Sequence, residues 1–205
     1  MVKKTWLLIG VAALCAALAG FWLARELDSS GPDLASGTWL PSPKAIADFH
    51  LTDDSGRDFA LAQLQGRPTL VFFGFTRCPD VCPTTLVKLA QAKKVAALQG
   101  LQVVLISVDP QRDTPAVLSQ YVHAFDPQFI GLTGAQDAIA KMAAEFGVAV
   151  SRVELPGGDY TMDHSAVVFL LDDRAHEVAI FTPPFDVQHL AQDLRLAAPH
   201  LDPKI

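Results

Sequence analysis

Two cysteines in one short segment are the residues best suited to chemistry. Residues 74–85 read GFTRCPDVCPTT, so three residues separate Cys78 from Cys82. Pro83 suits the first turn of a helix and disfavours helical dihedrals just before it, so we expect Cys82 to cap a helix starting at Pro83. Both sulfurs would then lie at or just before a helix N-terminus, beside Arg77, where positive charge favours thiolates. The pattern predicts reactive cysteines that are not deeply buried.

The spacing of this pair leaves two kinds of site open. The three-residue loop can close a disulfide, and it can also turn both thiolates toward one metal ion. A structural disulfide is the weaker interpretation, because so short a loop restricts the unfolded chain little. Two soft sulfurs together with an imidazole suit copper, particularly Cu(I).

His164 is the candidate imidazole, in the segment YTMDHS at 160–165, just before an apolar strand. Taken alone, such a histidine is more often a turn or core residue than a ligand. Asp163 could accept a hydrogen bond from the ring or only form a turn, and Met162 is more often packing than a thioether ligand. The other histidines share no ligand spacing with this site; they are His50, His123, His176, His189 and His200.

Three segments in order resemble the Sco/SenC family of copper-binding assembly proteins. They are the cysteine segment with its preceding apolar strand, VDPQRDTP at 108–115, and YTMDHS at 160–165. The resemblance runs from about residue 45 to 197, and it implies that Cys78, Cys82 and His164 are copper ligands. It further implies a role at the dinuclear copper site of cytochrome c oxidase, either delivering copper or reducing the thiols there. The implied partners are the copper-bearing oxidase subunit, other periplasmic copper chaperones and thioredoxin-like reductants.

Two segments call for comment beside this resemblance. The residues of 108–115 favour a simple turn, with Asp113 or Thr114 capping a helix that begins at Pro115. The segment 172–178, DDRAHEV, departs from the family pattern, because Ala175 and His176 stand where a glycine-bearing turn is expected. That departure leaves the local hairpin in question.

Apolar runs and helical periodicity indicate the elements that position these residues. Continuous apolar runs, typical of strands buried on both faces, occupy 69–75, 101–108 and 166–171. Helices are expected at 83–98, 115–125, 135–146 and about 187–196. A hairpin around Asp54-Ser55-Gly56 and a closing strand near 177–181 complete the order. This alternation predicts an α/β fold, a thioredoxin-like sheet flanked by helices, with functional groups beyond the carboxyl ends of its strands.

The N-terminus has the features of a membrane anchor. Residues 5–24 carry no charge, and a helix of that length just spans a hydrocarbon core of about 30 Å. Lys3 and Lys4 precede the run, so the positive-inside rule sends the rest of the chain across the membrane. A cleaved signal peptide is the alternative, with Ala17-Leu18-Ala19 as its small-residue site.

We therefore expect three parts: a membrane anchor with one transmembrane helix (1–24), a flexible linker rich in Ser, Gly and Pro (25–44), and a copper-binding domain (45–200). The expected location is the bacterial inner membrane, with a single pass and the soluble domain facing the periplasm. A formal net charge of −6 argues against a nucleic-acid partner, which needs a basic face.

Two functions are compatible with the predicted site. The favoured one is a copper metallochaperone that carries one ion per chain, a binding protein rather than a turnover enzyme. The alternative is a periplasmic thiol-disulfide oxidoreductase that uses Cys78 and Cys82 to reduce cysteines of the oxidase copper site. Both need the same reduced thiols, so they exclude one another at any instant. A peroxiredoxin-like peroxidase ranks third, because Thr76 stands two residues before Cys78 rather than three.

Overall fold

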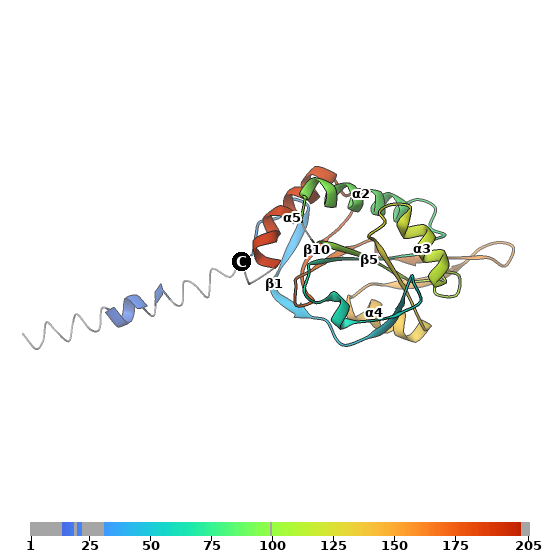
Figure 1. Cartoon of the computed structure of the whole chain (residues 1–205), viewed down its shortest axis with the longest axis horizontal. Helices are drawn as coiled ribbons and strands as arrows, with labels where there is room; N and C mark the ends of the chain where they lie inside the picture. The colour runs from blue at the N-terminus through green and yellow to red at the C-terminus, as the bar shows by residue number, and fades with distance from the viewer. Residues whose placement is uncertain (1–13, 19, 22–30, 99, 202–205) are drawn as a thin grey trace, which may run out of the picture. The chain divides into compact units, whose positions relative to one another are not determined.

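The computed structural model describes residues 14–18, 20–21, 31–98 and 100–201. The chain divides into two compact units, Met1–Gly31 and Pro32–Ile205, of which the second contains the sheet (Figure 1). In the first unit, residues 14–18 and 20–21 are helical. Across the described residues, no helix combines the length and the hydropathy needed to cross a membrane. Most of the anchor expected at 5–24 lies outside those residues.

An eight-stranded mixed sheet forms the centre of the second unit, in the order β1-β10-β9-β4-β5-β6-β2-β3. Its strands are β1 (Gly37–Ala45), β2 (His50–Asp53), β3 (Asp58–Ala60), β4 (Thr69–Gly74), β5 (Gln102–Ser107), β6 (Ile130–Thr133), β9 (Val168–Leu171) and β10 (His176–Phe181). β4, β5 and β6 pair in parallel, and the remaining neighbours pair antiparallel. A separate hairpin consists of β7 (Val150–Glu154) and β8 (Tyr160–His164).

Helices cover both faces of this sheet. They are α2 (Val81–Ala96), α3 (Pro115–His123), α4 (Gln136–Glu145) and α5 (Val187–Leu201), and a short 3-10 helix, η1, spans Leu61–Leu64. α2 and α5 pack side by side on one face, whereas α4 lies on the opposite side (Figure 1). α3 packs closely on β6 at Gly131. A Cβ on that residue would lie only 2.9 Å from the Leu118 Cβ, so the absence of a side chain permits the close approach.

The core is densest where the central strands run. Every residue of β4 and β5 is buried, as their continuous apolar runs predict for strands covered on both faces. On the α4 side, Phe73 and Phe169 contact Phe146 edge to face, with ring centroids 5.5 and 4.9 Å apart. These contacts hold the strand that leads into the cysteine segment.

The structure confirms most of the expected elements and extends them. The three apolar strands, the first hairpin, the closing strand and the four helices all form. β1 was not expected: it occupies 37–45 and pairs with β10, so residues 37–44 belong to the sheet and not to the linker assigned to 25–44. Its two prolines, Pro41 and Pro43, are tolerated because β1 is an edge strand.

The turn between β9 and β10 forms without a glycine. Ala175 takes the left-handed conformation, with φ of 63°, where the sequence raised doubt about the hairpin. The Asp172 carboxylate compensates by accepting hydrogen bonds from the backbone N–H groups of Arg174 and His176, at 2.9 and 2.7 Å. The two strands therefore pair as an antiparallel hairpin, with a register shift between Glu177 and Ala179.

A buried carboxylate on α5 fixes the start of the sheet domain. Asp193 is fully buried, and it accepts hydrogen bonds from the N–H groups of Ala35 and Ser36, each at 2.8 Å, and from the Ser36 hydroxyl. These bonds hold the chain immediately before β1.

We expect Asp193→Asn to lower the free energy of unfolding by about 2 kcal/mol, because an amide cannot accept all three bonds and hydrogen bonds to a charged group are the strong ones. Chemical denaturation measures this change. Asp33→Asn makes the same substitution at an exposed position nearby and should change stability by less than about 0.5 kcal/mol. Equal effects of the two variants would contradict the assigned role.

Candidate metal centre

The cysteine segment lies at the carboxyl end of β4, where α2 begins. α2 starts at Val81 with Asp80 as its cap residue, two residues earlier than expected. Pro83 is accommodated inside the first turn, because the first N–H groups of a helix have no intrahelical partners. Cys82 is therefore within the helix rather than its cap, and its N–H points to the Cys78 sulfur at 3.3 Å.

Cys82 is completely buried, which corrects the expectation of two accessible cysteines; Cys78 is half-buried. Gly74 leaves space for the Cys82 side chain, since a Cβ on residue 74 would lie 3.1 Å from the Cys82 sulfur. Burial, and then the hydrogen bond with Cys78, raise the pKa of the Cys82 thiol far above its ordinary value, while the N–H of Phe75 acts in the opposite direction. Cys82 is thus a protonated thiol at neutral pH, and the helix N-terminus does not make it a thiolate.

His164 ends β8 and contacts Cys82 directly. Its Nε2 lies 3.4 Å from the Cys82 sulfur, although 82 positions separate the two residues in the chain. Its Nδ1 lies 3.2 Å from the backbone carbonyl oxygen of Ser165, which can only accept, so Nδ1 carries the proton and Nε2 presents its lone pair to the sulfur. Burial lowers the pKa of His164, which keeps the ring neutral and able to bind a metal.

The neighbours of His164 take simpler roles than the sequence left open. Asp163 is exposed, and the Ser165 carbonyl takes the place at Nδ1 that Asp163 could have filled. Met162 packs against the core. Four other histidines pair with aspartates, and His200 packs on Trp39; these histidines are His50, His123, His176 and His189.

The three candidate ligands gather at one place, but not yet at coordinating distances. Within the described part of the chain, no three Cys, His, Asp or Glu side chains are already spaced to hold a metal ion. The Cys82 sulfur lies 3.4 Å from His164 Nε2, and the Cys78 sulfur accepts the Cys82 N–H at 3.3 Å, so the three donors of a three-coordinate site are neighbours.

Asp113 fixes the loop that carries Cys78, a role the sequence interpretation missed. This fully buried carboxylate accepts bonds from the Thr76 N–H and hydroxyl, at 3.1 and 2.6 Å, and from the Ser107 hydroxyl at 2.6 Å. Burial raises its pKa, and the bonds from Ser107 and Thr76 oppose that effect. Of the two residues expected to cap α3, Asp113 and Thr114, the structure shows Thr114 as the cap. The segment VDPQRDTP, which contains Asp113, was the signal in the sequence that could have pointed to this role, but its residues by themselves indicate a turn and a helix cap.

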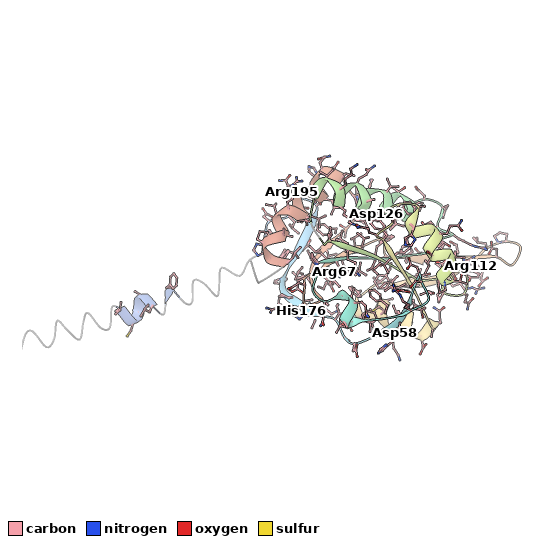
Figure 2. The ribbon with its side chains drawn as sticks, viewed as in Figure 1. Asp58, Arg67, Arg112, Asp126, His176 and Arg195 are labelled. Carbon is pink, nitrogen blue, oxygen red and sulfur yellow. The ribbon has the colours of Figure 1, made fainter. Side chains whose placement is uncertain are left out.

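A second contact group joins the 109–112 loop to the hairpin that carries His164. The Tyr160 ring lies between two guanidinium groups, with its centroid 3.6 Å from Arg112 and 3.7 Å from Arg152. The Tyr160 hydroxyl donates to Asp109 at 2.8 Å, and Asp109 also pairs with Arg112. Arg112 donates to the Tyr160 carbonyl at 2.9 Å, at the turn end of the hairpin (Figure 2). This clamp holds β8, and therefore His164, against the main sheet.

The arrangement has the chemistry of a soft-metal site. It combines two sulfurs with a neutral imidazole, a donor set that selects soft ions and excludes hard ones such as Mg²⁺. The same two sulfurs, four positions apart where the loop after β4 enters α2, can also form a disulfide. The fold and site define an α/β protein with a Cys-x3-Cys pair at the carboxyl end of a central strand and a distant histidine beside it.

Comparison with known proteins identifies the family. The chain matches SCO1/SenC over residues 40–198, and it belongs to that family. An SCO2-like protein from Rickettsia felis is 37% identical over 172 residues, covering 81% of this chain and 80% of that protein.

Two solved structures are similar throughout the domain. Arabidopsis thaliana ScoI with copper bound has a TM-score of 0.73 and 34% identity, covering 76% of this chain and 98% of that one. Bradyrhizobium japonicum ScoI with copper bound has a TM-score of 0.68 and 38% identity, covering 74% and 98%. The thioredoxin-like sheet with flanking helices is thereby confirmed.

Replacing Asp113 should loosen the cysteine loop. We expect Asp113→Asn to cost about 2 kcal/mol at pH 7, because an amide nitrogen would face hydroxyl and N–H donors. The pKa of Asp113 is raised in the folded state, so the folded chain holds this proton more tightly than the unfolded chain. The advantage of wild type over the variant should therefore grow as the pH falls through that raised pKa. Denaturation of both proteins between pH 4 and 8 measures it. Asp163→Asn, an exposed control, should show neither effect.

Proposed function

We propose that this protein is a copper metallochaperone that carries one ion bound by Cys78, Cys82 and His164. The observation that carries the proposal is the contact between the Cys82 sulfur and His164 Nε2. It joins a soft donor and a neutral imidazole that are 82 positions apart in the chain, and a metal ion can bind to both. The copper bound by the ScoI proteins of Arabidopsis thaliana and Bradyrhizobium japonicum supports the choice of metal.

Loading would exchange protons for the ion. The Cys82 thiol is protonated and lies against the Nε2 lone pair, so its proton must leave when the sulfur binds copper. With Cu(I) and two thiols, one cation enters and up to two protons depart, so affinity should rise with pH. Cys78 is half-buried whereas Cys82 is buried, which makes Cys78 the sulfur that the ion contacts first on loading and last on release.

The proposed recipient is the dinuclear copper site of cytochrome c oxidase, on its copper-bearing subunit. Membership of the SCO1/SenC family supports this assignment. Other periplasmic copper chaperones would supply the ion, and thioredoxin-like reductants would keep the cysteine pair reduced. A second candidate is thiol-disulfide exchange with cysteines of the oxidase site. It is favoured by the 3.3 Å approach of the Cys82 N–H to the Cys78 sulfur, which holds the two cysteines together where the loop enters α2.

We further propose that residues 1–24 anchor the chain in the bacterial inner membrane and that the sheet domain faces the periplasm. Lys3 and Lys4 before the uncharged run at 5–24 support this topology.

Copper binding should depend on the three ligands to different degrees. Cys78→Ser or Cys82→Ser removes a thiolate and should abolish tight Cu(I) binding. His164→Ala leaves both sulfurs, and it should weaken binding by more than roughly 100-fold, beyond what loss of an outer hydrogen-bond partner costs. Competition with a chromophoric Cu(I) chelator measures these affinities.

His50→Ala removes an exposed histidine and serves as the control, with affinity expected to stay at the wild-type value. Wild-type affinity in His164→Ala would contradict the assigned site and make the oxidoreductase the better hypothesis.

Topology is tested by reporter fusions in a bacterial host. Alkaline phosphatase, which folds actively only after export, should be active when fused after Ile205, and a cytoplasmic reporter at the same position should be inactive. Replacing Lys3 and Lys4 with glutamate should reduce export, because acidic residues do not retain the N-terminus in the cytoplasm. An active cytoplasmic reporter after Ile205 would refute the proposed orientation.

A further inference from the structure

Two buried phenylalanines contact the His164 ring in addition to its polar partners. The Phe72 and Phe75 rings meet the imidazole edge to face, with centroids 6.0 and 5.9 Å from its own and interplanar angles of 69° and 85°. Phe72 is fully buried and Phe75 is 2% exposed. The imidazole thus packs against side chains of the β4 segment, although His164 itself belongs to the hairpin outside the main sheet.

The end of β4 explains why both phenyl rings reach the same imidazole. Side chains alternate between the two faces of a strand, so residues 72 and 75 of an uninterrupted strand would point to opposite faces. β4 ends at Gly74, however, and Phe75 belongs to the loop that follows. The loop releases Phe75 from the alternation, and its ring joins that of Phe72 at His164. Phe73, between them, contacts Phe146 on the α4 side instead.

The polar contacts of His164 leave the plane of its ring only loosely restrained. The second side-chain torsion of a histidine has broad minima, so the ring has no strong orientation of its own. The contacts at Nδ1 and Nε2 are 3.2 and 3.4 Å long. A binding group has to be held within about 10–20° of its productive geometry, and the lone pair of Nε2 lies in the ring plane. Packing by the two phenyl rings can supply this restraint, because aromatic pairs prefer edge-to-face arrangements.

We propose that Phe72 and Phe75 are positioning residues that set the orientation of the His164 imidazole and thereby its strength as the third ligand. This inference rests on the proposed copper function. Neither phenylalanine has a donor atom, so each acts on a bound ion only through His164. Their effect on copper affinity should therefore vanish when the imidazole is removed, whereas a general loss of core packing would act with or without it.

Phe75→Leu tests the inference, because it keeps an apolar side chain in the core and removes the ring. In the reduced full-length chain, held in mild detergent, we expect Cu(I) affinity to fall about tenfold, the upper end of what one aromatic pair contributes. Phe72→Leu should change the affinity in the same direction. Phe129→Leu is the control, since its ring is 1% exposed and neighbours Lys93; it should be destabilised to a similar degree and bind copper like wild type.

Two further measurements separate positioning from packing. In the metal-free protein, NMR relaxation should show a more mobile His164 ring in Phe75→Leu but not in Phe129→Leu, because only Phe75 contacts the imidazole. In a double-mutant cycle, adding Phe75→Leu to His164→Ala should cost no further copper affinity.

A further fall in affinity in the His164→Ala background, as large as in wild type, would overturn the inference in favour of general packing. Wild-type affinity in Phe75→Leu, or an unchanged mobility of the His164 ring in that variant, would also overturn it and leave the copper function intact. Absence of copper binding in wild type would overturn the copper function and this inference together.

Discussion

The contact between the Cys82 sulfur and His164 Nε2 is the constraint around which the domain is arranged. These atoms are 3.4 Å apart but belong to separate pieces of structure, the helix that follows β4 and the hairpin outside the main sheet. Gly74 leaves space for the sulfur, and Asp113 holds the loop before it. The Tyr160 clamp brings the imidazole to the same point.

Burial gives both partners of this contact a neutral form. It raises the pKa of an acid such as the Cys82 thiol and lowers that of a base such as His164, because low polarity disfavours charge of either sign. The empty site therefore avoids an isolated buried charge. A cation that binds there would replace the thiol proton and neutralise the resulting thiolate in the same step. The apolar surroundings thus suit both the empty, neutral site and the site that holds a cation.

The sequence located the three candidate ligands more readily than the contacts that hold them. Cys78, Cys82 and His164 stand in recognisable segments, and the buried strand β4 is unmistakable as an apolar run. The clamp was missed because β7 is mostly exposed and β8 mostly half-buried, so neither strand has the apolar alternation that marks a strand in the sequence. The burial of Cys82 was also missed, since it depends on the space beside Gly74. The bonds from Thr76 to Asp113 were missed because they join positions 37 residues apart.

The hairpin that carries His164 pairs only with itself among the described strands, so an ion shared by Cys82 and His164 would act as a cross-link between hairpin and sheet. Any ligand that binds only the folded chain adds to its stability by mass action, about 2.7 kcal/mol at a free concentration one hundred times the dissociation constant. The bound copper ion would thus also stabilise the fold by linking two residues that are 82 positions apart in the chain. Release would return the chain to a state that opens more readily to proteases, and turnover of the protein in the cell would then track how much of it is loaded.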